Sequence, residues 1–382
     1  MYSVTVFRLI ERFNLLILMA ALFLAPGSAQ ATNVNVNCDT GGSINAALAG
    51  LDLVGPHTIS VTGTCAEQVG ILGRERVTIQ APEGQTATIN AGGGVALFVS
   101  RSHNVVLRRL VLTGGFAGLF LREGSQAAVE SLTLENNQYG AGVFANSTLF
   151  ISSSSVRNNG IFGVFVVASS MTELTTDVAV EQNGDAGVAI LDTSAGGVFN
   201  SIIRNNHGLG ILLLRASNLI LGGNTIVGNG ATGLRVSETS HAEMSANTIR
   251  NNGAGDPSSP GGLMLTEQGE AFLEGGNDIS NNTGPGVFAS ANATFSSGGG
   301  NTIINNTAEG VSLKRQSVGQ LFAADTISGN GGPNLACDTT SLAAGELTGV
   351  SNIRCMRIER ELGPPRPGRI ADLAYGLMRQ RP

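Results

Sequence analysis

The sequence predicts an all-β solenoid, a chain wound into about ten coils of three short strands each. The main observation is an asparagine that recurs every 22 to 30 residues, with an aliphatic residue three positions before it and, after most of them, a glycine four positions later. The nine asparagines are Asn137, Asn159, Asn183, Asn206, Asn229, Asn252, Asn282, Asn306 and Asn330. The repeat glycines extend the series to ten: Gly94, Gly118, Gly142, Gly163, Gly187, Gly210, Gly233, Gly262, Gly286 and Gly310.

The composition favours stacked strands over helices. The 382 residues include 53 glycines, no tryptophan and a single lysine, and only 13% of them are charged. Glycine and asparagine suit tight turns, whereas the valine and threonine between them suit strands. The net charge is −6 and no basic stripe runs through the repeats, which argues against nucleic acid as a partner.

The first residues predict an export signal. Arg8 and Arg12 precede an apolar run over 15–25, and the small residues at 29–31 suit signal peptidase, so the mature chain is expected to begin at Thr32. An uncleaved membrane anchor is the alternative. No later stretch is apolar enough to span a bilayer. We therefore expect a secreted, periplasmic or cell-surface protein.

Four cysteines flank the repeats, two at each end. In an oxidising compartment local pairing is expected, Cys38 with Cys65 and Cys337 with Cys355, although four cysteines permit three connectivities. Such bridges would fasten the caps that protect the open ends of a solenoid. The predicted division of the chain is a signal peptide at 1–31, an N-terminal cap at 32–70, a parallel β-helix at 71–340, and a C-terminal cap with a basic tail at 341–382.

Each period contains three apolar segments that are too short for helices. After Gly210 these segments are 211–214, 218–221 and 224–226, each bounded by glycine, asparagine or serine. Stacked coils would pair every strand with its copies above and below, in three parallel sheets. The asparagine column would then satisfy turn backbone along the axis. A second column comprises Asn224, Asn247, Asn277, Asn301 and Asp325.

Two other solenoids fit less well. Leucine-rich repeats need a leucine frame that valine, isoleucine, serine and threonine occupy here. Left-handed β-helices need six-residue sub-repeats, and none are visible. The recurring Asn-Thr-Ile-x-x-Asn followed by glycine and an aliphatic residue, as over 224–234 and 301–311, resembles the right-handed parallel β-helix repeat of the pectin lyase-like superfamily.

The resemblance covers about residues 33 to 340 and includes the cap, where a cysteine, a short helix and the stretch 59–65 are similar to those of bacterial members. It implies a right-handed, single-stranded parallel β-helix. It leaves activity open, because the superfamily includes pectate and pectin lyases, polygalacturonases, alginate epimerases, phage tailspikes and proteins without known chemistry.

The catalytic signatures of these relatives are missing. The chain has no Asp-Asp, Gly-His-Gly or Arg-x-Lys of the polygalacturonase kind. The Asp-Pro-His-Asp of alginate epimerases has its nearest counterpart at Asp256-Pro257-Ser258-Ser259, which lacks the histidine and the second aspartate. The acidic residues that calcium-dependent pectate lyases use vary in spacing, so calcium stays open as an alternative, although no motif supports it. His57, His103 and His241 fall at unrelated positions of the repeat, so we expect no metal and no cofactor.

The residues two positions after each repeat glycine form an outward row that includes four phenylalanines. The first and third residues after each repeat glycine are aliphatic and point inward, so the second points outward. This row comprises Ala96, Phe120, Phe144, Phe165, Ala189, Leu212, Arg235, Met264, Phe288 and Ser312. The resemblance implies that this strand lines a polysaccharide groove, which makes Phe120, Phe144, Phe165, Arg235 and Phe288 candidate glycan contacts. The favoured alternative is that a neighbouring subunit or the C-terminal tail covers the row.

Charged residues flank this strand on both sides. Asp185, His207 and Asp256 lie between the asparagine column and the glycine, and with Arg235 they are candidates to bind and deprotonate an acidic sugar. Solvated turn residues are the favoured alternative for this set. On the other side, Asp192, Arg215 and Glu238 occupy consecutive coils and are expected to form a surface ion-pair ladder.

The tail departs from the repeat. Residues 351–382 hold seven arginines against three acidic residues. Prolines at 364–367 indicate a linker, and Ile370, Leu373, Ala374, Leu377 and Met378 have the spacing of an amphipathic helix. A basic helix on an acidic body predicts a docking element, with a membrane surface as the weaker alternative.

These observations predict an exported β-helix protein that interacts with polysaccharide or cell-surface glycans and has no recognisable catalytic set. Two alternatives stay open. One is a polysaccharide lyase or epimerase acting on acidic polysaccharide. The other is a structural surface protein that self-associates through the phenylalanine row.

Overall fold

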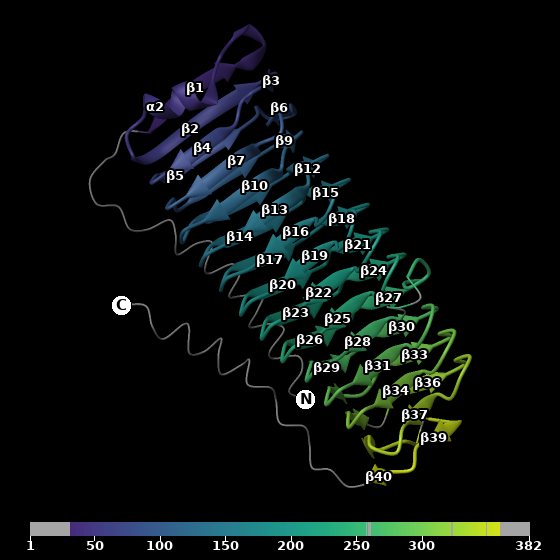
Figure 1. Cartoon of the computed structure of the whole chain (residues 1–382). Coiled ribbons are helices and arrows are strands. Elements are labelled where there is room, and N and C mark those ends of the chain that lie inside the picture. Colours follow the sequence, from purple (N-terminus) through teal and green to yellow (C-terminus); the bar gives the residue numbers. More distant parts are fainter. Residues whose placement is uncertain (1–30, 257, 259–260, 322–323, 349, 360–382) are drawn as a thin grey trace.

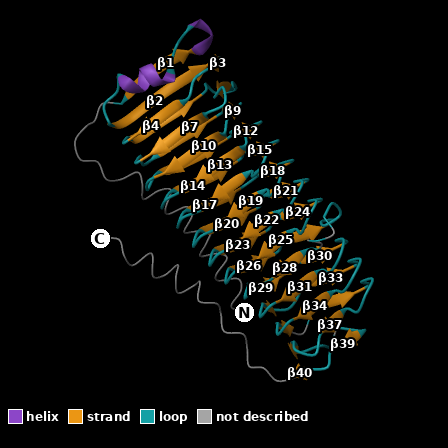
Figure 2. Cartoon of the chain, viewed as in Figure 1, coloured by secondary structure: helices purple, strands orange, loops and turns teal. Residues whose placement is uncertain are grey.

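The computed structural model describes residues 31–359, except for 257, 259–260, 322–323 and 349. The predicted signal peptide and the predicted tail helix lie outside the described residues. The described chain is a right-handed parallel β-helix in which three parallel sheets run the length of the molecule (Figure 1). Figure 2 shows that helix is confined to the N-terminal end. Among the described residues, no helix is long and apolar enough to cross a membrane.

The sheets contain 15, 12 and 13 strands and are called sheets A, B and C here. In sheet order, sheet A consists of β1 (Thr32–Asn37), β2 (Val54–Thr62), β5 (Glu75–Gln80), β8 (Val105–Arg108), β11 (Gln126–Glu130), β14 (Thr148–Ser152), β17 (Met171–Thr175), β20 (Ala195–Phe199), β23 (Asn218–Gly222), β26 (His241–Ser245), β29 (Glu270–Gly275), β32 (Thr294–Ser297), β35 (Val318–Leu321), β38 (Leu342–Gly345) and β40 (Ile358–Glu359). Sheet B consists of β3 (Thr64–Cys65), β6 (Ala87–Asn90), β9 (Leu110–Thr113), β12 (Thr133–Glu135), β15 (Ser155–Arg157), β18 (Ala179–Glu181), β21 (Ile202–Arg204), β24 (Thr225–Val227), β27 (Thr248–Arg250), β30 (Asp278–Ser280), β33 (Thr302–Ile304) and β36 (Thr326–Ser328). Sheet C consists of β4 (Val69–Leu72), β7 (Val95–Ser100), β10 (Ala117–Arg122), β13 (Tyr139–Val143), β16 (Val164–Val166), β19 (Val188–Ile190), β22 (Ile211–Leu213), β25 (Leu234–Val236), β28 (Leu263–Leu265), β31 (Val287–Ser290), β34 (Val311–Lys314), β37 (Leu335–Cys337) and β39 (Ile353–Arg354).

The predicted count of about ten coils is too low, because sheet C contains 13 strands and the solenoid therefore has about 13 turns. The missing turns lie at the two ends. In sheet C, strand β4 precedes the first repeat glycine, Gly94, and strands β37 and β39 follow the last, Gly310. Strand pairing therefore extends beyond the sequence motif.

Asparagine ladders run along the axis as predicted. The backbone N–H and Nδ2 of each buried asparagine donate to Oδ1 of the asparagine one coil further on, as Asn206 does to Asn229 at 3.1 and 2.9 Å. The second ladder, which starts at Asn224, ends on Asp325. An aspartate suits that end because it only has to accept, from the backbone and side chain of Asn301.

A third ladder is made of serines. The backbone N–H of Ser102 donates to Oγ of Ser125, and the same bond repeats at every coil as far as Ser240. Gly269 and Ala293 occupy the next two coils, and the bond returns from Ser317 to Ser341. The buried turns between sheets C and A therefore satisfy their backbone with hydroxyls instead of amides.

Both ends are fastened by disulfides. Cys38 is bonded to Cys65 and Cys337 to Cys355, which confirms the predicted pairs. At the N-terminal end helix α2 (Ile44–Ala49) covers the core and follows the short 3-10 helix η1 (Cys38–Thr40). The carboxylate of Glu67 accepts from the backbone N–H of Ile44 at 2.6 Å, at the start of α2. This bond satisfies a donor that the helix itself leaves free.

Candidate ligand-binding face

The outer face of sheet C carries the row that the sequence singled out, with two corrections. Strand pairing aligns Ala96 with Gly118 and Gly140, so the repeat position in these coils lies two residues away from Gly94 and Gly142. The outward row is therefore Phe98, Phe120, Gly142, Phe165, Ala189, Leu212, Arg235, Met264, Phe288 and Ser312. Phe98 replaces Ala96 in the row, and Gly142 stands where Phe144 was expected.

Phe144 lies outside the row, but its ring occupies the space that Gly142 leaves empty in the row. A Cβ atom on Gly142 would lie 2.9 Å from the Phe144 ring and 3.0 Å from the Phe120 ring. The missing side chain therefore leaves the space into which Phe144 folds. Its ring stacks on Phe120 at 4.7 Å between centroids and meets Phe165 edge-on at 5.4 Å.

Three further rings widen this row into an aromatic cluster. Tyr139 lies 5.8 Å from Phe165 and 5.2 Å from Phe116, and Phe162 lies 5.0 Å from Phe165 between ring centroids. Phe116 and Phe162 precede β10 and β16, and Tyr139 is the first residue of β13. The aromatic cluster consists of Phe98, Phe116, Phe120, Tyr139, Phe144, Phe162 and Phe165.

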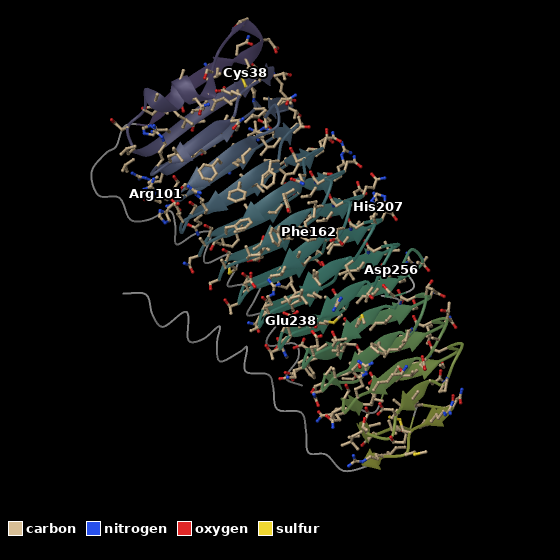
Figure 3. The ribbon with its side chains drawn as sticks, in the orientation of Figure 1. Cys38, Arg101, Phe162, His207, Glu238 and Asp256 are labelled. Atoms are coloured by element: carbon tan, nitrogen blue, oxygen red, sulfur yellow. A yellow bond between two sulfur atoms is a disulfide. The ribbon has the colours of Figure 1, made fainter. Side chains whose placement is uncertain are left out.

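The cluster is open to solvent and largely uncharged. Phe116 is 46% exposed and the other six rings are half-buried. Figure 3 shows Phe162 on the face of the sheet, between Arg101 on one edge and His207 on the other. The guanidinium of Arg122 lies 4.9 Å above the ring of Phe98, at one end of the cluster. Seven adjoining rings form a larger apolar surface than scattered exposed residues do, and such surfaces mark binding sites.

Beyond the cluster the row becomes polar. Arg235 projects between Leu212 and Met264, and its Nε is buried without a hydrogen-bond partner. Within the described part of the chain it forms no ion pair. An arginine with an unsatisfied donor suits an anionic ligand. Phe288, two coils further along, lies 5.5 Å from the Lys314 ammonium and far from the aromatic cluster.

Asp185, His207 and Asp256 occupy one edge of this face, where Figure 3 shows His207 and Asp256. The structure does not join them into a cluster, since no ion pair links any of them to another or to Arg235 within the described residues. Burial raises the pKa of the Asp185 carboxyl. Asp256 accepts from the backbone N–H and the hydroxyl of Ser258 at 2.9 and 2.6 Å, so it orders its own loop.

On the opposite edge the predicted ion-pair ladder is present. Arg215 lies 3.1 Å from Asp192 and 3.5 Å from Glu238. All three side chains are about half exposed, so the pairs contribute little to stability. The edge therefore bounds the candidate face without adding a site.

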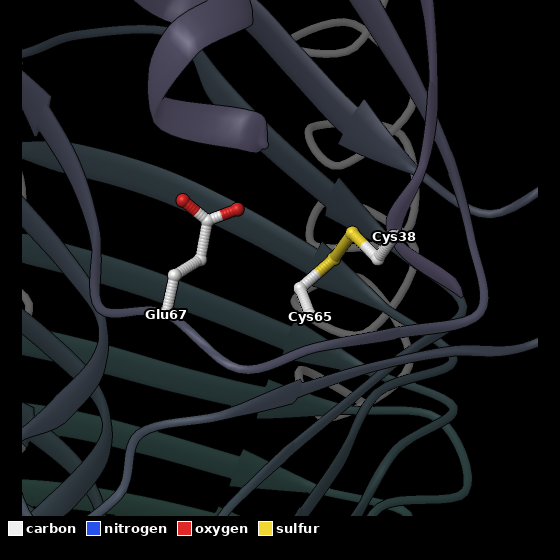
Figure 4. A group of neighbouring side chains, drawn as sticks. All are labelled: Cys38, Cys65 and Glu67. Atoms are coloured by element: carbon white, nitrogen blue, oxygen red, sulfur yellow. A yellow bond between two sulfur atoms is a disulfide. The ribbon is translucent and has the colours of Figure 1, made fainter. Parts of the chain in front are cut away.

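A metal centre finds little support in the described residues. The one group of ligand type there is Cys38, Cys65 and Glu67, shown in Figure 4. Its two sulfur atoms form the disulfide, and its carboxylate accepts from the start of helix α2. Neither is free to bind an ion. The absence of a cofactor remains a prediction.

Comparison with known proteins supports the fold. Residues 186–345 match the family described as right handed beta helix region, and residues 99–259 match the family described as periplasmic copper-binding protein (NosD). No curated protein matches the chain. Copper binds to cysteine, methionine and histidine. The four cysteines here form disulfides, the four histidines lie on different coils, and Met171, Met244 and Met264 lie on three separate strands, so the described residues do not fit a copper centre.

Two solved structures are similar over most of their length. The A-module of mannuronan C-5 epimerase AlgE4 from Azotobacter vinelandii has a TM-score of 0.56 at 15% identity, covering 83% of this chain and 92% of that one. A variant of the periplasmic alginate epimerase AlgG has a TM-score of 0.57 at 14% identity, covering 88% and 86%. At such identities the likeness concerns the fold alone.

Proposed function

We propose that this chain, a right-handed parallel β-helix, binds a polysaccharide or a cell-surface glycan along the outer face of sheet C. The observation that carries the proposal is the aromatic cluster. Sugar rings have apolar faces that pack on aromatic rings, and a soluble protein rarely leaves seven such rings together in water.

The shape of the cluster favours an extended ligand. The rings follow the solenoid axis from β7 to β16, which is three coil steps or about 14 Å. A single small molecule would cover only part of that length. A chain of repeating sugar units parallel to the axis can contact a ring at each coil. The two similar structures are a module of a mannuronan C-5 epimerase and an alginate epimerase, which agrees with a polymeric ligand on this fold.

The charge distribution separates two regions of the face. The aromatic cluster suits uncharged sugar faces, whereas Arg235 suits a carboxylate or sulfate. One ligand that lies along the face would meet the rings first and Arg235 three coils beyond Phe165. The protein then binds without the catalytic residues of known relatives, and its two disulfides suit an oxidising compartment outside the cytoplasm.

The unsatisfied Arg235 also favours a second candidate function, a lyase or epimerase acting on acidic polysaccharide. A guanidinium that pairs with a uronate carboxylate acidifies the adjacent carbon-bound proton. Asp185, whose pKa is raised by burial, is the nearest candidate base by sequence pattern. This candidate requires Asp185 and Arg235 to reach the same sugar.

Binding is tested by calorimetry of the full chain against neutral and acidic oligosaccharides. Phe120→Ala should weaken binding by about tenfold, because one stacked ring contributes on the order of 1 kcal/mol. Phe150→Ala is the matched control, since Phe150 is a half-buried, outward ring on sheet A. Equal affinity of both variants, or no binding by the parent, would overturn the proposal.

Catalysis is tested separately with uronate polymers, by following unsaturated products and the exchange of solvent deuterium into the sugar. The second candidate predicts product that disappears in Arg235→Gln. Binding without product supports the first proposal. Product that persists in Arg235→Gln excludes the role assigned to Arg235.

A further inference from the structure

A second surface, on the outer face of sheet A, combines apolar and acidic side chains. Ile220, Glu243 and Phe272 are register neighbours on β23, β26 and β29. Ile220 is 39% exposed. The sheet A patch consists of Ile220, Glu243, Glu270, Phe272 and Glu274.

The patch has an excess of negative charge. The His241 imidazole lies 3.3 Å from the Glu270 carboxylate and 3.7 Å from that of Glu243, so one cationic side chain pairs with two carboxylates. Glu274 forms no ion pair within the described residues. Burial, together with the charge of Glu243, raises the pKa of the Glu274 carboxyl. A cationic side chain beside Glu274 would stabilise its ionised form.

The chain leaves the solenoid on this same sheet. β40, the last strand of sheet A, ends at Glu359, and residues 360–382 follow. The ten residues 360–369 can span at most about 33 Å. β29 and β23 lie four and six coil steps from β40, or about 19 and 29 Å. The segment that starts at Ile370 can therefore reach the patch.

The tail has the complementary chemistry. Residues 360–382 contain five arginines and two acidic residues. The sequence predicts an amphipathic helix whose apolar side includes Ile370, Leu373 and Leu377. We propose that this segment of the chain docks on the sheet A patch, with its leucines against Ile220 and Phe272 and its arginines beside Glu243 and Glu274.

The same geometry argues against the aromatic cluster as the docking surface. β16, the near end of that cluster, lies eight coil steps from β39 on sheet C, or about 38 Å. Its far end at β7 is about 53 Å away. A linker of about 33 Å ends short of both. Docking on sheet A leaves the proposed glycan face open.

The test is the rate at which trypsin removes the tail from the full chain after Arg369 and Arg379, followed by mass spectrometry at low ionic strength. Leu377→Asp should speed removal by about tenfold or more, because it loses one buried leucine. Ile220→Asp should do the same. Ile202→Asp is the matched control, since Ile202 is 42% exposed but lies on sheet B.

Faster removal in Leu377→Asp and Ile220→Asp, with Ile202→Asp unchanged, supports docking on the patch. A tail removed as fast in the parent as in Leu377→Asp overturns the proposal. So does release by Phe120→Ser in place of Ile220→Asp, which would locate the tail on sheet C. A parent rate that rises on dilution would show that the occupant is a second copy.

Discussion

Asn229→Ala removes one step from the middle of the longest asparagine ladder. The Nδ2 of Asn229 donates to Oδ1 of Asn252 at 2.9 Å and to the carbonyl of Ile203 at 3.3 Å. Its Oδ1 accepts from the backbone N–H and the Nδ2 of Asn206, at 3.1 and 2.9 Å. The substitution therefore deletes four hydrogen bonds, and all partners are buried.

The magnitude follows from this count. A net hydrogen bond contributes about 1 kcal/mol, and a buried group left unsatisfied costs about 1–3 kcal/mol. Local relaxation recovers part of that, so we expect a loss of about 3 kcal/mol in the free energy of unfolding. The 1% exposure of Asn229 leaves little access for water to replace the bonds.

The assay is guanidinium unfolding followed by circular dichroism, with amide hydrogen exchange to locate the loss. Asn218→Ala is the matched control, because Asn218 begins strand β23 of a neighbouring turn and is half-buried on the outer face. It should lose well under 1 kcal/mol. Exchange should accelerate in the turns at Asn206 and Asn229. Equal losses in the two variants would refute the ladder as a source of stability.

Three further predictions concern single sites. His57→Phe should raise the free energy of unfolding by about 1 kcal/mol, since both ring nitrogens of His57 are buried without partners; a loss in denaturant melts would contradict this. Burial lowers the pKa of His241, but Glu243 and Glu270 outweigh burial and raise the pKa to about 9. The ion pairs therefore stabilise the fold by about 1–2 kcal/mol, screened by solvent; this contribution is complete below the ordinary histidine pKa of 6.5 and is lost as pH rises through 9. The stability gap between the parent and His241→Gln should close over that range, and a constant gap would exclude the ion pair. Gly142→Val should displace the Phe144 ring and weaken oligosaccharide binding by about fivefold, with thermal melts nearly unchanged; unaltered affinity would show that the ring does not contribute.

Much of the fold is predictable because successive coils satisfy their buried turn backbone with the same residue type. Asparagine is scarce enough outside the turns that its recurrence predicts the ladder, and the paired cysteines predict the fastened ends. The serine ladder recurs at the same spacing from Ser102 to Ser240. It escapes notice because serine is common elsewhere in the chain and because Gly269 and Ala293 interrupt it.

The candidate face is less predictable, because it depends on the register of the sheet C strands and on which side chains beside the row meet in space. Two glycines stand two residues apart at Gly140 and Gly142, and only strand pairing decides that Gly140 is the repeat position. Phe116 and Phe162 join the aromatic cluster from turns, and Tyr139 joins it from the start of β13. No sequence motif indicates that these three rings lie together. The feature of the sequence that indicates this cluster is the density of aromatic residues between 98 and 165.

The most direct test of the proposed function uses Tyr139 as an internal reporter. The chain has no tryptophan and three tyrosines, so Tyr2→Phe with Tyr375→Phe leaves Tyr139 as the only strong emitter, within the aromatic cluster. Adding the bound oligosaccharide should change its fluorescence saturably, and Phe120→Ala should shift that titration to about tenfold higher concentration. Binding detected by calorimetry with no change at Tyr139 would place the ligand elsewhere and contradict the account.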